Sequence, residues 1–140
     1  METDKQEETL LLFAYGTLRK DEPLHGWIEK EVVRSHGTAK MPRARLYYPK
    51  AHNGYPYLVL TDSPSDEAIG EVFEVPINEQ IIRMFQMEIN AGYSVSEAEA
   101  ELADGTTVDV AVCEWSHPTA VGDEVPGNDW RSPERMGWWR

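Results

Sequence analysis

The sequence Leu10-Leu11-Leu12-Phe13-Ala14-Tyr15-Gly16-Thr17-Leu18-Arg19 lies near the N-terminus and is the most informative segment of the chain. Its first part, up to Tyr15, is a continuous apolar run, which predicts a short strand buried on both faces. Gly16 and Thr17 break the run, so the strand should end in a turn. Backbone N–H groups at such a strand exit can stay unpaired and bind a carboxylate or a developing oxyanion. The alternative is a structural turn in which Gly16 supplies unusual backbone angles.

The composition of the 140 residues fits one globular domain. Apolar residues make up 41 % and charged residues 27 %, which argues against wholesale disorder. The 25 acidic and 13 basic residues give a net charge of −12. This charge argues against nucleic acid and against an anionic membrane surface as partners, since both require clustered Lys and Arg. No apolar run approaches the about 20 residues that span a bilayer, and no signal peptide is visible. We therefore expect a cytoplasmic protein.

Outward from the first segment, the sequence predicts short strands and two main helices. Helical spacing runs over residues 24–33, and a second helix follows Asn78, which is a good N-cap. Its apolar face is predicted to hold Ile81, Ile82, Phe85 and Ile89. Extended chain or strands are expected over residues 35–48, 55–60, 69–75, 95–102 and 106–115, with a hairpin at Asp104-Gly105.

These elements predict an α+β domain in which about six strands form a mixed, curled sheet or a small β-barrel. Residues 10–131 would form this single domain, between a flexible N-terminal tail at 1–9 and a Trp-rich C-terminal tail at 132–140. On the strand over residues 95–102, alternation predicts one buried and one solvated face. Ala98, Ala100 and Leu102 would point inward, and Glu97, Glu99 and Glu101 outward.

Glu88 is the strongest candidate for acid–base chemistry. It lies seven residues after Ile81 and three after Phe85, so a helix would carry it on or beside the apolar face. Burial there disfavours the charged carboxylate and raises its pKa, which suits a group that accepts and returns protons near neutral pH. The alternative is that the helix ends near Met87 and that Glu88 faces solvent.

The other candidate residues either have two interpretations or exclude particular kinds of site. Tyr93 follows Glu88 closely and either hydrogen-bonds a substrate or packs as a strand aromatic. Cys113 is the single cysteine, which excludes an intrachain disulfide and a cysteine-based zinc site. No metal-ligand spacing, serine-hydrolase elbow or phosphate-binding loop is present. The four histidines are scattered, at His25, His36, His52 and His117.

Several segments, in order, resemble the γ-glutamylcyclotransferase-like superfamily, which includes γ-glutamylamine cyclotransferases and AIG2-like proteins. The family's Y-G-[ST]-L signature is similar to Tyr15-Gly16-Thr17-Leu18, and His25 resembles a histidine that commonly follows it. Glu88 lies where the family carries its catalytic Glu, whereas Val95 replaces the Arg or Lys that usually follows the tyrosine. The remaining similar segments are Gly54-Tyr55-Pro56, Ile69 to Val75, Gly92-Tyr93 and Gly127 to Arg131.

The resemblance implies an intramolecular reaction in which the α-amine of a γ-glutamyl amide attacks its own γ-carbonyl. The products would be 5-oxoproline and a free amine. It further implies that Glu88 moves the protons, that the backbone of Gly16, Thr17 and Leu18 binds the substrate, and that Tyr15 and Tyr93 line the pocket. No metal or organic cofactor is implied, and the protein would act as a monomer or homodimer on a small-molecule γ-glutamyl substrate.

Two readings without catalysis remain open. One is a binding module that keeps the pocket and captures a small carboxylate or γ-glutamyl group without turnover. The other is an acidic interaction protein, which would need its negative charge in one continuous patch or an exposed pair of Trp138 and Trp139. The alternative for these two tryptophans is that they close over the core of the domain.

Overall fold

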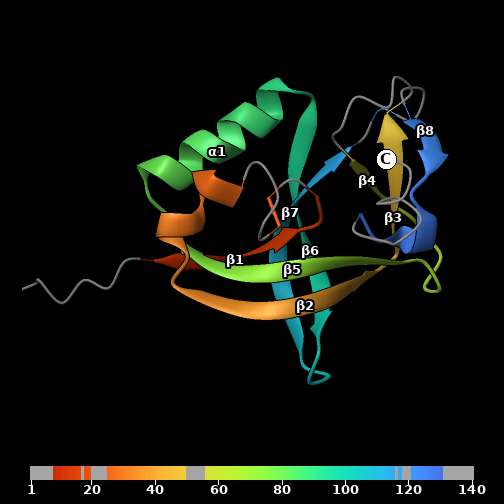
Figure 1. Cartoon of the computed structure of the whole chain (residues 1–140), viewed down its shortest axis with the longest axis horizontal. Coiled ribbons are helices and arrows are strands. Elements are labelled where there is room, and N and C mark those ends of the chain that lie inside the picture. The colour runs from red at the N-terminus through yellow and green to blue at the C-terminus, as the bar shows by residue number, and fades with distance from the viewer. Residues whose placement is uncertain are drawn as a thin grey trace, which may run out of the picture.

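The computed structural model describes residues 8–16, 18–19, 25–49, 56–115, 117 and 121–130. These residues form a β-barrel with a helix on its outside and a second, smaller sheet beside it (Figure 1). The predicted tails lie outside the described residues, apart from residues 8 and 9, and Thr9 already belongs to the first strand. The strands are β1 (Thr9–Ala14), β2 (Arg34–Pro42), β3 (Ala44–Pro49), β4 (Tyr57–Leu60), β5 (Glu67–Pro76), β6 (Tyr93–Leu102), β7 (Thr107–Trp115) and β8 (Val121–Glu124).

The barrel is closed, with the strand order β1-β5-β2-β6-β7. Neighbouring strands run antiparallel except for β1 and β7, which close the barrel in parallel through Leu12 and Ala111. This arrangement confirms the α+β class and the small barrel predicted from the sequence. The strand β1 is buried on both faces, as its continuous apolar run predicted. Phe13 packs inside the barrel, whereas Leu12 and Ala14 pack outside it.

The smaller sheet has the order β4-β3-β8 and packs against the end of the barrel. The region predicted as extended over residues 35–48 is two strands, β2 and β3, which meet at Arg43 with a φ of 60°. The short strand β8 has no counterpart in the sequence prediction. Four residues with two exposed acidic side chains carry too little apolar alternation to reveal a strand.

The helix α1 (Glu79–Asn90) begins where the sequence predicted. The Asn78 side chain accepts a hydrogen bond from the Ile81 N–H at 3.0 Å and so caps the first turn. The predicted apolar face is wrong in part, because Ile82 and Ile89 are about half exposed, at 45 % and 52 %. The face turned to the barrel follows the spacing i, i+3, i+4, i+7. It consists of Ile81, Met84, Phe85 and Glu88.

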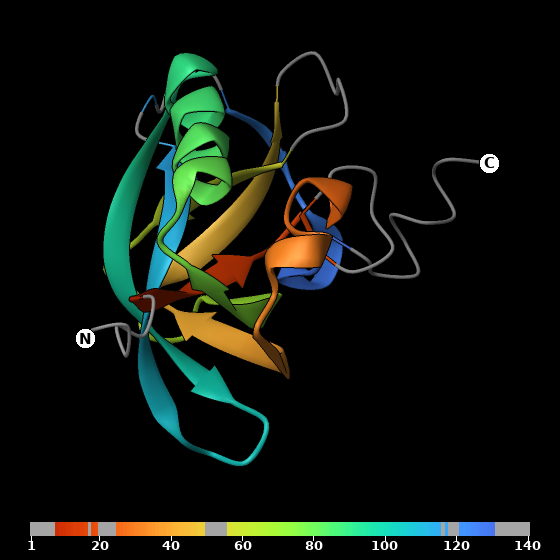
Figure 2. The same cartoon turned by 90° about the vertical axis from the view of Figure 1, so that its left-hand side faces the viewer.

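The second predicted helix, over residues 24–33, is not an α-helix. The described part forms two short 3₁₀ turns, His25–Trp27 and Glu29–Glu31, before the chain enters β2 (Figure 2). Gly26 costs helix stability, and so short a segment is marginal without strong packing. Among the described residues 25–33, only Ile28 is fully buried, and it packs beneath α1 with Val75. A further 3₁₀ turn, Pro126–Asn128, follows β8.

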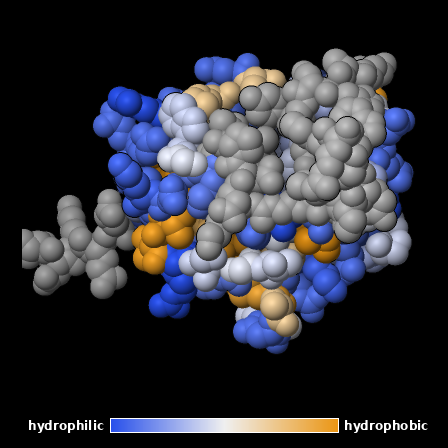
Figure 3. Space-filling view, in the orientation of Figure 1, coloured by the Kyte–Doolittle hydropathy of each residue, from blue (hydrophilic) through white to orange (hydrophobic). Residues whose placement is uncertain are grey.

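The hairpin of β6 and β7 supplies the longest register in the molecule, from Tyr93 opposite Trp115 to Glu101 opposite Thr107. The predicted alternation of β6 is confirmed, because Glu97, Glu99 and Glu101 are exposed whereas Ala100 is buried. Among the coloured residues on the face in Figure 3, most are hydrophilic and the hydrophobic ones form small separate patches. Within the described residues, no helix has the length and apolar character needed to cross a membrane.

Candidate active site

A cavity of about 440 Å³ opens between the C-terminal half of α1 and the barrel, beside the end of β1. This volume is in the range of small-molecule sites, about 300–1,000 Å³. Its walls come from β1, the start of β4, α1 and strands β6 and β7, so the cavity brings together segments far apart in the sequence. The lining residues are Leu12, Phe13, Ala14, Tyr15, Gly16, Leu18, Pro56, Tyr57, Met87, Glu88, Ala91, Tyr93 and Cys113.

The exit of β1 forms one edge of this cavity. Tyr15, Gly16 and Leu18 line it, and the Arg19 N–H donates a hydrogen bond to the Gly16 carbonyl at 3.0 Å, which closes a tight turn. Gly16 does not have a positive φ, so unusual backbone angles are not the reason for glycine here. A Cβ at this position would lie 2.4 Å from Cγ of Pro56. Glycine therefore allows the turn to approach Pro56. Thr17 lies outside the described residues.

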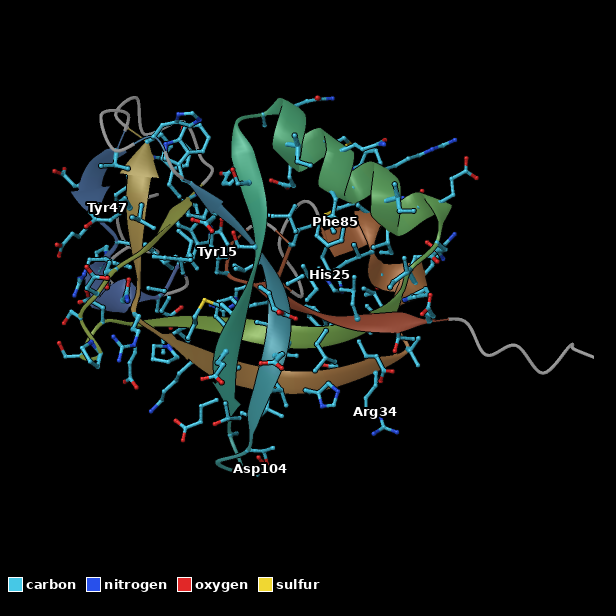
Figure 4. The ribbon with its side chains drawn as sticks, turned by 180° about the vertical axis from the view of Figure 1, so that it is seen from behind. Tyr15, His25, Arg34, Tyr47, Phe85 and Asp104 are labelled. Atoms are coloured by element: carbon cyan, nitrogen blue, oxygen red, sulfur yellow. The ribbon has the colours of Figure 1, made fainter. Side chains whose placement is uncertain are left out.

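Glu88 reaches the cavity from the barrel-facing side of α1. The helix continues to Asn90, so Glu88 is not the fully exposed end residue of the alternative reading, and its side chain is partly buried. Burial removes water from the carboxylate and raises its pKa above the usual value of a glutamate. Phe85 precedes it by one turn and points from α1 toward the barrel (Figure 4).

Tyr15 joins the exit of β1 to β7. Its hydroxyl donates a hydrogen bond to the carbonyl oxygen of Cys113, and the side chain is 7 % exposed. Burial first, and then the nearby acidic groups of Tyr93, Cys113 and Glu88, raise the pKa of Tyr15 well above 10. The phenol thus stays neutral and lines the cavity with its ring.

Tyr93 opens β6 and forms part of the cavity wall. Its hydroxyl donates a hydrogen bond to the Pro56 carbonyl at 2.8 Å. Its ring meets Trp115 edge-on at a centroid distance of 5.1 Å, and Trp115 stacks on Tyr57 at 3.9 Å. Just before Tyr93, Gly92 has a φ of 112°, and a Cβ there would lie 2.6 Å from the Trp115 ring. Tyr93 therefore packs as a strand aromatic and also faces the cavity.

Cys113 is the clearest residue of the site that sequence reasoning did not assign. It is 5 % exposed, and burial together with nearby Glu88 raises the pKa of its thiol to about 12. The thiol is therefore protonated and a poor nucleophile at neutral pH. Its place in the cavity depends on the pairing of β7 with β1, and nothing in the local sequence of β7 announces that pairing.

The structure thus brings Glu88, Tyr15, Gly16, Leu18 and Tyr93 around one cavity. A carboxylate with a raised pKa lines the same cavity as a glycine turn, an arrangement that can move protons beside a group held by backbone donors. His25 lies outside the lining, where its Nδ1 is 2.9 Å from the Leu18 carbonyl oxygen. Among the described residues, no group of three or more His, Cys, Asp and Glu side chains is arranged to hold a metal ion.

A barrel that carries such a cavity beside one outer helix is the architecture of a known group of proteins. The model of the gamma-glutamyl cyclotransferase, AIG2-like family matches residues 12–132. The chain therefore belongs to this family, and its general kind is cyclotransferase-like. No curated protein sequence matches the chain significantly.

Solved structures share the fold at low sequence identity. An uncharacterised protein from Pyrococcus horikoshii superimposes with a TM-score of 0.68 and 24 % identity, over 94 % of this chain and 98 % of that one. A mouse AIG2-like protein gives 0.70 and 19 %, over 91 % and 92 %. A gamma-glutamyl cyclotransferase gives 0.64 and 19 %, over 85 % and 73 %.

Proposed function

We propose that the protein cleaves γ-glutamyl amides by cyclisation, releasing 5-oxoproline and a free amine. The observation that carries this proposal is Glu88, a partly buried carboxylate in an apolar cavity that also contains the Gly16 turn. Family membership supports the same general chemistry. The reaction needs no nucleophile from the protein, because the α-amine of the substrate attacks within its own molecule at a high effective concentration.

Proton movement is the task that the chain must perform. The α-nitrogen enters as an ammonium group and leaves as a lactam N–H, so it loses two protons. The leaving nitrogen gains two protons as it changes from an amide N–H to an ammonium group. In the proposed mechanism the Glu88 carboxylate accepts a proton from the α-nitrogen and delivers it to the leaving nitrogen, once for each proton. A pKa raised toward neutrality suits both halves of this cycle.

Negative charge on the substrate needs hydrogen-bond donors. In the described part of the chain, the backbone N–H groups of Gly16 and Leu18 make no hydrogen bond, and both residues line the cavity. We assign them, with Thr17, to the substrate α-carboxylate or to the oxyanion that forms when the α-nitrogen bonds to the γ-carbonyl carbon. Tyr15 and Tyr93 hold the walls, because each of their hydroxyls donates to a backbone carbonyl.

The test is release of 5-oxoproline from a panel of γ-glutamyl amides by the wild-type chain and by Glu88→Gln. Glutamine keeps the shape of the side chain but cannot carry the proton, so we expect kcat/KM to fall about 10²- to 10⁴-fold. Glu99→Gln, on the exposed face of β6, is the matched control and should keep full activity. Equal activity of wild type and Glu88→Gln would exclude Glu88 as the proton carrier. A panel without any 5-oxoproline would refute the proposed function and favour the binding-module alternative.

A further inference from the structure

We infer that the amine half of the substrate is a hydrophobic monoamine, that is, an aliphatic or arylalkyl chain without a carboxylate or a second ammonium group. This inference rests on the proposed function, and it names the substrate class for the same cavity. Three observations carry it: the size of the cavity, the chemistry of its walls, and the position of Glu88 among them.

The cavity is larger than the glutamyl half of the substrate requires. At about 30 Å³ per water-sized group, 440 Å³ holds about fifteen such groups. A γ-glutamyl group has about nine non-hydrogen atoms, so the remaining space fits an amine of about five or six. The cavity therefore has room for a chain on the leaving nitrogen as well as for the glutamyl group.

Hydrocarbon and aromatic groups form the walls around that space. The strand β1 contributes Leu12 and Ala14, and the end of α1 contributes Met87 and Ala91. Tyr57 adds an aromatic face, held by its parallel stack on Trp115. Such walls favour each buried methylene of a ligand by about fourfold in affinity. The flexible thioether side chain of Met87, which is 40 % exposed, adapts to chains of different shape.

The described walls offer a carboxylate on the amine half no cationic partner, and the N–H groups of Gly16 and Leu18 are assigned to the glutamyl half. The hydroxyls of Tyr15 and Tyr93 donate to backbone carbonyls. Among the described lining residues, Glu88 is the only Asp, Glu, Lys, Arg or His. A carboxylate on the amine half would lose its water beside a second carboxylate, which is unfavourable on both counts. A second ammonium group would also lose water, and it would compete with the α-ammonium for Glu88.

Three substrates separate these possibilities, because they share one five-carbon chain. They are γ-glutamyl-n-pentylamide, γ-glutamyl-L-norleucine, which adds only a carboxylate, and the γ-glutamyl monoamide of 1,5-diaminopentane, which adds only an ammonium group. We expect kcat/KM for the pentylamide to exceed both others by at least about tenfold. If either charged substrate is cleaved as efficiently as the pentylamide, the inference is overturned while the proposed function stands.

A charge added to the wall gives an independent check. Met87→Lys places an ammonium group at the cavity, and we expect it to raise kcat/KM for the norleucine conjugate relative to the pentylamide by about twofold to fivefold. The matched control is Ile89→Lys, which adds the same charge to the same helix at an exposed position outside the lining. If both variants change the ratio of the two kcat/KM values equally, the effect comes from net charge and the inference is contradicted.

A binding measurement without turnover tests the ligand class separately from the proposed reaction. Isothermal titration calorimetry with the Glu88→Gln protein should give tighter binding of the pentylamide than of either charged conjugate. If the pentylamide binds preferentially but the wild type releases no 5-oxoproline, the ligand class is supported and the proposed reaction is refuted. If none of the three conjugates binds or reacts, both proposals are refuted.

Discussion

At the scale of single residues, the position of Glu88 on α1 determines what the cavity can do. It occupies the seventh position after Ile81, so the same helical stripe that buries Ile81 and Met84 carries the carboxylate to the cavity. Burial raises its pKa, which means that the native state binds the Glu88 proton more tightly than the unfolded chain does. This burial suits the proposed role of Glu88 as proton carrier and costs the protein stability at neutral pH.

The pH dependence of stability should reveal this cost. Because the native pKa is raised, the stabilisation from the protonated form is complete below the unfolded pKa, near 4.5, and is lost as the pH rises through the native value. Glu88→Gln stays neutral at every pH. Its free energy of unfolding relative to wild type should therefore increase from pH 4 upward and level off above the native pKa, as measured by urea denaturation at each pH. A difference between the two proteins that does not change with pH would contradict this account.

At the scale of elements, α1 is the part that must be held still for Glu88 to reach the cavity. Asn78 caps its first turn, and the Asn78 side-chain amide also donates to the Glu31 carboxylate at 2.6 Å. The cap thereby connects α1 to the 3₁₀ turn at Glu29–Glu31.

Removal of this cap should weaken the whole helix. We expect Asn78→Ala to lower the free energy of unfolding by about 1 kcal/mol, because the Ile81 N–H loses its acceptor. Asn78→Ser keeps a capping oxygen and loses only the contact with Glu31, so its loss should be smaller. Chemical denaturation of the two variants measures the difference. If serine and alanine destabilise equally, the contact with Glu31 outweighs the cap.

Local signals made some elements predictable and left others hidden. The N-cap and the helical spacing located α1, and the alternation of β6 with the Asp104-Gly105 turn located the long hairpin. The helical spacing also predicted Glu88 as a candidate residue, because the helical period determines which side chains face the barrel. The 3₁₀ turns replaced a predicted helix because so short a segment takes its conformation from packing, here of Ile28 beneath α1. Cys113 and Met87 line the cavity through contacts that exist only in the closed barrel, and no local sequence pattern predicts those contacts.

At the scale of the whole molecule, Asn128 holds the segment after β8 against the smaller sheet. This residue is 7 % exposed and has a φ of 55°, a conformation that asparagine tolerates better than most residues. Its side-chain oxygen accepts from the Leu46 N–H at 2.6 Å, and its amide donates to the Ala44 carbonyl at 2.9 Å. The side chain thus acts as a substitute strand partner for β3 and fastens the segment after β8 to the smaller sheet.

Asn128→Gly isolates the value of these two hydrogen bonds, because glycine adopts the same backbone conformation without strain. The buried Leu46 N–H would lose its acceptor, and we expect the free energy of unfolding to fall by about 1–3 kcal/mol. Denaturant titration followed by tryptophan fluorescence measures this change, since Trp130 lies in the barrel core near Asn128 in sequence. A loss below about 0.5 kcal/mol would show that water replaces both partners.

The closure of the barrel by β1 and β7 also governs how the protein is made. The strand β1 leaves the ribosome well before its parallel partner β7, which ends at Trp115, so the barrel cannot close until β7 has been synthesised. Until then the apolar run from Leu10 to Tyr15 stays without its final cover, which is the state in which chains aggregate or bind chaperones. Such distant pairing also slows folding to milliseconds or longer. A segment that shapes the cavity therefore waits for β7 during biosynthesis, and truncation within β7 should yield an insoluble chain rather than a smaller folded domain.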